Sequence, residues 1–534
     1  MTEGRWRDPR LAAGAFGLAV VVAVPVILYL NRDQWFFLDE WDFLSTRQLT
    51  SPASLLRPHN EHWYTVPIVL YRLVFRLVGL HHYWPYQVLT VSAHLVAAVL
   101  IRVVMRRAGV SPWLATVAAT VFVYFGTGRE NIGWAFQVGF TAPLAFGLVH
   151  LLLVDHDGRV DRRDVAGMGF GVLGLMCSSV GVTMVPAVAA AVLLRRGWRP
   201  ALLHASVLGA VYLTWFGFHG QVASSGSAAS PSELARFARN AIEETLRGLG
   251  QAPAVGVGLA LVLVLGTGLR LARSGDQDAR ATYAGTAGLM VGAASFIALS
   301  GYGRAHLSPE PASRYMYLIA AMVLPAIALA ATDIARHWRP ATLAVGALLL
   351  LGLPGNIGAL EPTGVVRYTL GARDPVLVMA ATPTPPGSPR SMRPLPLAAP
   401  GMTLGWLRDA AAGGRIPHPR PGSMSLQPSM RLAMSIEQVN GDGTPRQCVV
   451  KRGDGPITAL RGELLRVLAS GAAVAGAGPL VGAQMAYYSA SVSPQAFDTL
   501  DRPEVRLLVV TDRVQLSVRG PEAGTRVLRC AAAL

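Results

Sequence analysis

The chain has 534 residues, of which 52% are hydrophobic and only 15% are charged. This composition excludes an ordinary soluble globular protein and indicates an integral membrane protein. The formal net charge of +16 would suit a nucleic-acid-binding protein, but the arginines lie largely in short loops between apolar runs and in the C-terminal part. A membrane topology explains the loop arginines better, so we expect no nucleic-acid partner.

The first apolar run, residues 11–30, contains no charged residue. It has the length of roughly 20 residues that a membrane-spanning helix needs. Arg5, Arg7 and Arg10 precede it, as they would in a secretory signal peptide. The run is followed by residues 31–34 (NRDQ) instead of a small-residue cleavage site, so we expect an uncleaved membrane anchor.

Further apolar runs follow at residues 84–104, 114–125, 134–153, 165–180, 182–194, 201–218, 252–269, 281–299, 315–331 and 341–353. Together with the first run, they predict a polytopic α-helical membrane protein with about eleven transmembrane helices. Under this count every arginine-rich loop falls on the side of the N-terminus, which is therefore cytoplasmic. Counting residues 64–80 as a further span would invert the later loops. Arg72 and Arg76, at helical spacing, favour an amphipathic helix on the membrane surface there.

The character of the sequence changes near Asn356. We expect a transmembrane domain over residues 1–355 with a long first outer loop at 31–63, a Pro-rich linker over 356–400, and an extracytoplasmic, strand-containing domain over 401–534. Cys177 lies in an apolar run and is expected in the core. Cys448 and Cys530 either pair in an oxidising compartment or remain two buried thiols.

The first outer loop carries two polar clusters. Asp39, Glu40 and Asp42 stand among tryptophans and phenylalanines directly after the first span, where burial can raise a carboxylate pKa and fix its orientation; the alternative is a set of solvated loop acids. Later in the loop, the segment HNEH with His59, Glu61 and His62 suggests an acceptor pocket. A divalent cation is the lesser alternative, because the spacing is not that of a helical zinc motif, and we expect no other cofactor.

Two later outer loops add charged residues. Arg129 and Glu130 form either an ion-paired interfacial turn or part of the site. The segment at 300–317 places cations on the side of the membrane where positive charge is normally sparse, namely Arg304, His306 and Arg314, with Tyr315 beside them. A guanidinium binds phosphate through two parallel hydrogen bonds, so this group suits an anionic lipid headgroup. Ion pairing with the acids of the first loop is the alternative.

In these features the chain resembles the GT-C superfamily of polyprenyl-phosphate-dependent membrane glycosyltransferases. The resemblance rests on the first span, the acidic pair Asp39 and Glu40, the surface helix, the later spans and the C-terminal domain. It implies a multi-pass protein of the cytoplasmic membrane whose active site lies on the outer face. There it would transfer a sugar from a polyprenyl-phosphate donor to an envelope glycan, lipid or protein acceptor.

The resemblance also implies roles for residues in this inverting reaction. Asp39 is the first choice for the general base and Glu40 the second, while Arg304 and Arg314 would hold the lipid phosphate. A transporter or a lipid or polysaccharide flippase is the main alternative function. We find no internal repeat of the kind that transporters often show, and the polar clusters lie at the predicted outer surface.

Overall fold

The computed structural model describes residues 8–220, 229–271, 277–362, 365–396, 399–438, 448–451, 457–468, 474–476, 504–519 and 526–531. The chain forms two compact units, each assembled from separate stretches of sequence. The first, here called the helical unit, consists of Met1–Arg32, Leu49–Leu70 and Trp84–Thr363. The second, the C-terminal unit, combines Asp33–Gln48 and Tyr71–Tyr83 with Gly364–Leu534. The acidic stretch of the first outer loop thus belongs with the C-terminal residues.

The helical unit confirms the multi-span prediction. Among the described residues, eight helical segments are long and apolar enough to cross a membrane, at Pro9–Leu30, Trp84–Arg107, Ala135–Leu153, Trp198–His219, Pro253–Arg270, Thr282–Arg304, Ser313–Ala335 and Ala341–Ala359. The remaining predicted runs also form helices, but these are shorter: α5 (Pro112–Val123), α8 (Arg162–Leu175) and α9 (Val180–Arg196). About eleven apolar helices are therefore present, of which eight meet the length for a full span.

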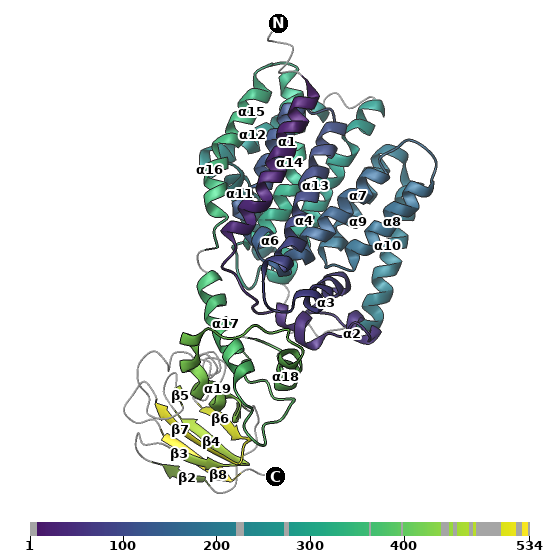
Figure 1. The fold of residues 1–534 in the computed structure, drawn as a ribbon. Coiled ribbons are helices and arrows are strands. Elements are labelled where there is room, and N and C mark those ends of the chain that lie inside the picture. Colours follow the sequence, from purple (N-terminus) through teal and green to yellow (C-terminus); the bar gives the residue numbers. More distant parts are fainter. Residues whose placement is uncertain are drawn as a thin grey trace. The chain divides into compact units, whose positions relative to one another are not determined.

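As labelled in Figure 1, the long helices are α1 (Pro9–Leu30), α4 (Trp84–Arg107), α7 (Val138–Leu153), α10 (Trp198–His219), α12 (Pro253–Leu271), α13 (Gln277–Arg304), α14 (Ser313–Ala335) and α15 (Ala341–Leu351), the last followed by α16 (Leu353–Ala359). Shorter elements between them are α2 (Pro52–Leu56), η3 (Gly126–Gly128), α6 (Arg129–Gly133) and η4 (Ala135–Gln137). The predicted outer loop after α10 contains a further helix, α11 (Pro231–Gly250), which starts at a Ser230/Glu233 capping box.

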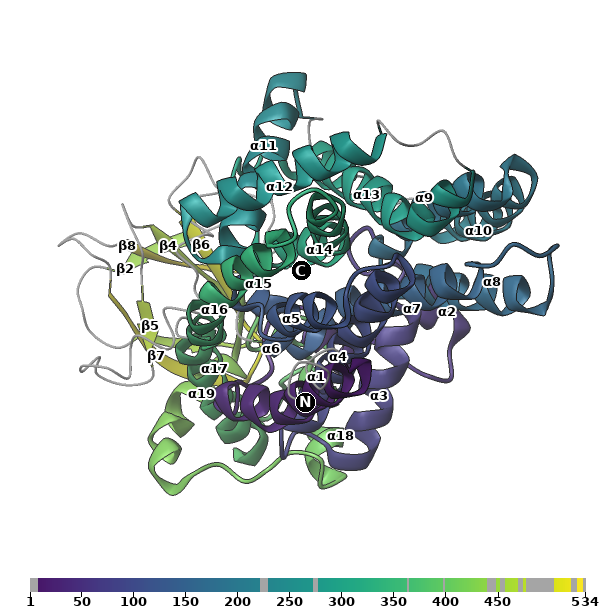
Figure 2. The same ribbon diagram turned by 90° about the horizontal axis from the view of Figure 1, so that it is seen from above.

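Helix α14 forms the centre of the helical unit. Figure 2, which looks along the bundle, shows α4, α5, α12, α13 and α15 around it. Small residues let the backbones approach closely, as is usual between membrane helices. A side chain at Gly266 of α12 would collide with Ala330 of α14, and one at Gly288 of α13 would collide with the Ala187 carbonyl of α9.

One end of the bundle collects the arginine-rich helix ends predicted to be cytoplasmic. The guanidinium of Arg195 lies 2.5 Å from Asp155 and 2.8 Å from Asp157, and Arg107 lies 3.1 Å from the same Asp155. These contacts join the C-terminal ends of α4, α7 and α9. The clustering of basic loops at one end, inferred from charge alone, is therefore present in the structure.

A buried polar network stabilises this end between α7, α8, α9 and α10. The fully buried carboxylate of Asp164 accepts hydrogen bonds from Arg196 at 2.5 Å and from His204 Nε2 at 3.0 Å. A second imidazole, His150, lies 3.0 Å from the other ring nitrogen of His204. Because an ionised group is costly among apolar helices unless it is paired, these partners are needed to keep Asp164 inside.

The C-terminal unit joins helices to two antiparallel sheets. Its helices are α17 (Val365–Ala381), α18 (Leu404–Ala412), η5 (Pro421–Leu426) and α19 (Gln427–Ala433). Among the described strands, β1 (Ile436–Gln438), β6 (Glu504–Val509), β4 (Glu463–Leu468), β8 (Arg526–Ala531) and β2 (Cys448–Lys451) form one sheet in that order. A second sheet has the order β3 (Ile457–Leu460), β7 (Arg513–Arg519), β5 (Val474–Gly476). The strand-containing C-terminal region is thus confirmed.

The cysteines and the expected linker can be compared directly with this unit. Cys448 and Cys530 face each other across β2 and β8 and form a disulfide, so they are not two separate thiols. Cys177 is a buried free thiol in the helical unit. The stretch expected as a Pro-rich linker contains the 17-residue helix α17, with Pro375 inside it.

Two stretches from the N-terminal part complete the C-terminal unit. They contain the short π-helix η2 (Asp42–Thr46) and the second half of α3 (Thr65–Val78), the amphipathic helix expected at residues 64–80. The indole of Trp406 packs edge-on against Trp41 with ring centroids 6.1 Å apart and stacks on Phe75 at 5.6 Å. Arg415 adds a hydrogen bond of 3.2 Å to the Phe75 carbonyl. The tail therefore holds the acidic stretch in a fixed conformation.

Replacing Asp164 by Asn should destabilise the helical unit, because the change leaves the buried Arg196 guanidinium without its counter-charge. We expect the free energy of unfolding to fall by about 3–5 kcal/mol, measured by SDS titration of the purified protein in mixed micelles. The matched control is Asp157→Asn, since Asp157 also pairs with an arginine but its side chain is 74% exposed; a loss under about 1 kcal/mol is expected there. Equal stability of the two variants would contradict the structural role of Asp164.

Candidate functional site

The three acids of the first outer loop occupy three different environments. Glu40 is fully buried. Its carboxylate accepts hydrogen bonds from the hydroxyls of Tyr71 at 2.7 Å and Tyr83 at 3.0 Å and from the Phe37 backbone N–H at 3.1 Å. A carboxylate enclosed in this way organises the surrounding chain, and it is poorly placed to meet a substrate. Its burial disfavours Glu40 as the general base, for which it was the second choice. It favours a role in positioning the neighbouring residues of the loop.

Asp42 is bound within the protein as well. Its carboxylate lies 2.7 Å from the guanidinium of Arg47, a side chain that is only 2% exposed, and Thr46 donates a further hydrogen bond to it. This pair caps η2 and links its two ends. The acid is thus neutralised by a buried partner, as expected for a structural ion pair.

Asp39 is partly exposed, unlike Glu40, the next residue along the chain. It follows Leu38, whose φ of 48° lies in the left-handed region and whose side chain is 41% exposed. A left-handed leucine is an uncommon, strained backbone state that persists where the surroundings enforce it. Here the surroundings are an aromatic cluster in which Trp35 packs edge-on against Trp41 and Phe36 against Tyr83. The fold thus leaves Asp39 partly exposed next to a tightly packed aromatic cluster.

The HNEH segment of the helical unit forms a tight turn. The backbones of His59 and His62 exchange hydrogen bonds of 3.0 and 3.1 Å, and Asn60 takes a left-handed φ of 52° between them, which Asn tolerates better than most residues. Both imidazoles pack against the Tyr64 ring, with centroids 5.5 and 5.8 Å away. Glu61 is exposed at the tip of the turn.

The electrostatics of this turn connect it to Arg304 at the C-terminal end of α13. Removal from water, together with the positive charges of Arg304 and His59, lowers the pKa of His62 to about 4. His62 is therefore neutral at pH 7, with its buried Nδ1 lacking a hydrogen-bond partner in the described part of the chain. Arg304 itself is exposed and has no ion pair among the described residues.

The second outer loop is fastened to the start of α14. Arg314 lies 3.0 Å from Glu130 and over the ring of Tyr315 at 5.1 Å. Asn131 donates to the Arg314 carbonyl at 2.9 Å, and Ser313 donates to the Thr127 carbonyl at 2.8 Å. Arg314 thus pairs with an acid, but with one of the second outer loop and not of the first.

The structure brings the predicted residues together in separate groups. The turn with His59 and His62 lies near Arg304, and the second outer loop reaches this turn through Phe136, whose ring lies 5.7 Å from His59. The second group consists of Glu130, Arg314 and Tyr315. The neighbouring Arg129 is exposed. His306, which follows Arg304 in sequence, is partly exposed. The acids 39, 40 and 42 belong to the C-terminal unit.

Several partners of these residues escaped the sequence analysis. Tyr71 lies within the amphipathic helix α3 and Tyr83 follows it, and nothing in the pattern indicates that both hydroxyls reach Glu40. Arg47 could have been found as a cation five residues after Asp42, although such a spacing is common in loops. Ser313 and Asn131 are ordinary polar loop residues whose role depends on tertiary contact alone.

Metal ligation can be assessed from the arrangement of donor atoms. In the described part of the chain, the group of His and carboxylate side chains close enough to share an ion is His156, Asp161 and Asp164. This group lies at the arginine-rich end of the bundle, where Arg196 and His204 already bind Asp164. The HNEH turn does not gather three such donors among the described residues.

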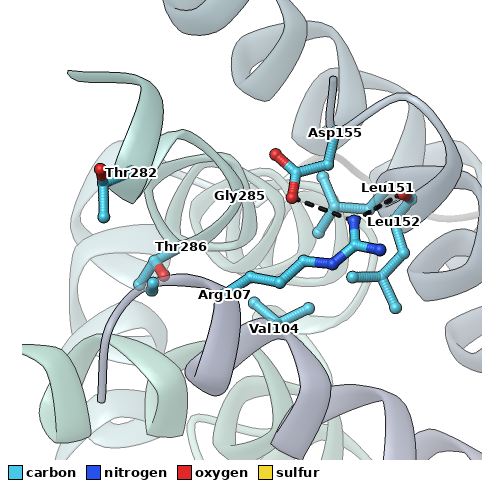
Figure 3. Close-up of a pocket in the computed structure, with 9 residues that line it drawn as sticks. Val104, Arg107, Leu151, Leu152, Asp155, Thr282, Gly285 and Thr286 are labelled. Carbon is cyan, nitrogen blue, oxygen red and sulfur yellow. Dashed lines mark hydrogen bonds and ion pairs between the residues drawn. The ribbon is translucent and has the colours of Figure 1, made fainter. Parts of the chain in front are cut away.

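Figure 3 shows a small cavity between α4, α7 and α13 at the same arginine-rich end. The Arg107 guanidinium points to Asp155 and to the Leu152 carbonyl, 2.8 Å away. The cavity volume of about 10 Å³ is that of a single water molecule at most. It is too small for a sugar or a lipid headgroup, so the chemistry belongs elsewhere.

Comparison with known proteins gives little direct guidance. No protein-family model matches the sequence, and no curated protein does. Two solved structures of ArnT from Cupriavidus metallidurans resemble the chain. The one bound to undecaprenyl phosphate has 14% identity and a TM-score of 0.47, covering 79% of this chain and 89% of that chain. The apo structure has 12% identity and a TM-score of 0.49, covering 95% and 98%. Similarity at this level assigns neither a family nor an activity.

Replacing Glu40 by Gln should destabilise the C-terminal unit. One amide oxygen can still accept the tyrosine hydroxyls, but the new NH₂ group then faces the Phe37 N–H, and the charge that strengthened all three hydrogen bonds is lost. We expect a loss of about 1.5–3 kcal/mol in the free energy of unfolding, followed by tryptophan fluorescence. Glu61→Gln, which alters an exposed acid, should change it by less than about 0.5 kcal/mol. If Glu40→Gln unfolds like the wild type, Glu40 does not organise this segment.

Proposed function

We propose that this chain is a membrane glycosyltransferase of the GT-C type, which transfers a sugar from a polyprenyl-phosphate donor to an acceptor hydroxyl. The observation that carries the proposal is the difference among the three clustered acids. Glu40 is fully buried and Asp42 pairs with the buried Arg47, whereas Asp39 is partly exposed and directly follows the left-handed Leu38. An inverting displacement needs a single carboxylate base of this kind.

In the proposed reaction, the Asp39 carboxylate takes the proton of the acceptor hydroxyl as its oxygen attacks the anomeric carbon. The bond between that carbon and the phosphate oxygen breaks, and the electron pair leaves with the polyprenyl phosphate. One substitution of this kind inverts the anomeric configuration. The base ends protonated and returns its proton to water after the product leaves.

Arg304 is the preferred residue for the leaving phosphate. It is exposed, it lacks an ion pair among the described residues, and it lies near a neutral histidine that does not compete for the anion. Arg314 is already paired with Glu130 at 3.0 Å. A phosphate would have to displace that acid, so we assign Arg314, with Tyr315, a supporting role. His306 follows Arg304 in sequence and remains a candidate for the same phosphate.

We assign the HNEH turn to acceptor binding. His62 stays uncharged at pH 7 because its pKa is lowered to about 4, and a neutral imidazole can both accept and donate hydrogen bonds to sugar hydroxyls. Glu61 and Arg129 are exposed and available to the same acceptor. We place these groups on the extracytoplasmic face, because the arginine-rich opposite end suits the cytoplasm.

Asp39→Asn tests the proposed base. The amide keeps the shape of the side chain but cannot take a proton, so turnover should fall by about 10²- to 10⁴-fold. Donor affinity should survive, because the base acts on the acceptor. The measurement is transfer of radiolabelled sugar from polyprenyl phosphate by the purified protein, with donor binding followed separately. Near wild-type turnover in Asp39→Asn would remove Asp39 from catalysis, and unfolding curves would show whether a loss reflects misfolding.

A further inference from the structure

The C-terminal unit has a pocket that the proposed transfer reaction does not use. Its volume is about 650 Å³, which lies within the range of small-molecule sites. The walls are residues 385–386, helix α19 with the residues after it, and the turn from β6 into β7. We propose that this pocket binds an anionic saccharide through its carboxylate or phosphate group.

Two arginines give the pocket its charge. Arg431 of α19 and Arg513 of β7 both line it, and both are exposed. Neither guanidinium has an ion pair or a side-chain hydrogen bond within the described part of the chain. Elsewhere in the unit, Arg529 lies 2.6 Å from Glu463 and Arg390 lies 2.7 Å from Asp409. Two guanidinia that have no ion pair among the described residues, one on α19 and one on β7, suit an oxyanion, which a guanidinium binds in a planar, bidentate manner.

The one acid of the pocket does not cancel this charge. Asp512 lies beside Arg513 at the rim, and its side chain is 74% exposed. It lies 3.7 Å from Arg461, which does not line the pocket. The net charge of the lining residues, two arginines and one aspartate, is therefore positive.

The turn between β6 and β7 supplies a buried hydroxyl that is unpaired within the described residues. Thr511 lines the pocket and is only 3% exposed, and its Oγ1 has no hydrogen-bond partner among the described residues. An unsatisfied buried hydroxyl costs about 1–3 kcal/mol, so a protein rarely keeps one without use. In contrast, the neighbouring Ser435 donates its hydroxyl to the Arg431 carbonyl at 2.7 Å. A ligand oxygen in the pocket could accept a hydrogen bond from the Thr511 hydroxyl.

The shape of the pocket favours a saccharide over a bare ion. A free phosphate would fill only a small part of 650 Å³. The described lining also includes the rings of Pro385, Pro386 and Pro428, the apolar side chains of Leu432 and Val514, and the amide of Gln515. Proline rings offer an apolar surface for the C–H face of a sugar, and the amide offers hydrogen bonds to its hydroxyls. The lining has no aromatic ring, so stacking of a nucleotide base is not supported.

The test is calorimetric titration of the full-length protein in detergent with four probes, namely glucuronate, glucose 1-phosphate, glucose and inorganic phosphate. We expect the two anionic sugars to bind and glucose not to. Arg431→Ala and Arg513→Ala should each weaken that binding by tenfold or more. Arg304→Ala should leave the affinity for glucuronate, which carries no phosphate, unchanged, and this separates the pocket from the proposed donor site. Equal affinity for inorganic phosphate and the anionic sugars, or for glucose and glucuronate, would overturn the proposal.

Thr511→Val provides a variant that should not harm folding. Valine has nearly the same shape without the hydroxyl, so the melting temperature should stay the same or rise, whereas affinity for the anionic sugars should fall severalfold. Asp512→Asn should strengthen binding, because it removes a negative charge beside Arg513 at the rim of the pocket. Unchanged affinity in Thr511→Val together with unchanged affinity in both arginine variants would show that the pocket holds only water.

Discussion

Polar groups enclosed by apolar helices need partners, and this requirement determines much of the structure. Water is absent from a bilayer core, so each buried donor, acceptor or charge must be satisfied within the protein. Arg270 of α12 therefore binds Asp333 of α14 through two hydrogen bonds of 2.5 and 2.8 Å. His94 of α4 lies 2.9 Å from the Tyr317 hydroxyl of α14. Such pairs fix the rotation of each helix against the central α14.

The same requirement separates structural from reactive polar groups. Glu40 and Asp42 have strong partners inside the protein, and so has Arg314. Arg304 is exposed and Asp39 is partly exposed, and Glu61 and Arg129 of the predicted set are exposed as well. A buried, hydrogen-bonded charge contributes to stability, whereas a charge that solvent reaches can also meet a substrate. This contrast is the physical basis for the assigned roles.

Much of the fold could be predicted from the sequence because the bilayer sets the length and composition of a spanning segment. The apolar runs are helices, residues 64–80 contain the amphipathic α3, and the arginine-rich ends of α4, α7 and α9 meet. The length of individual helices was less predictable. Runs such as 114–125 and 165–180 form helices of 12 and 14 residues, which are too short for a full span.

The sequence indicated which residues the candidate site contains, but not which other residues they contact. Local sequence marks the acidic cluster and the HNEH turn, because charges next to a span are unusual. It cannot show that Tyr71 and Tyr83 enclose Glu40, or that Trp406, several hundred residues away, packs on Trp41. These contacts form within the C-terminal unit, which joins residues 33–48 and 71–83 to residues 364–534, far away in the sequence. The expected linker at 356–400 similarly gave no sign of the helix α17, because proline is normally avoided inside helices.

The most direct test of the account is a transfer assay with the wild-type protein reconstituted in vesicles that carry a polyprenyl-phosphate sugar labelled in the sugar. Envelope glycans and lipids serve as the acceptors. The account predicts that label moves to an acceptor with inverted anomeric configuration, and that one polyprenyl phosphate is released for each sugar transferred. Movement of the intact labelled donor to the opposite leaflet, with no release of polyprenyl phosphate, would instead identify a flippase and contradict the account.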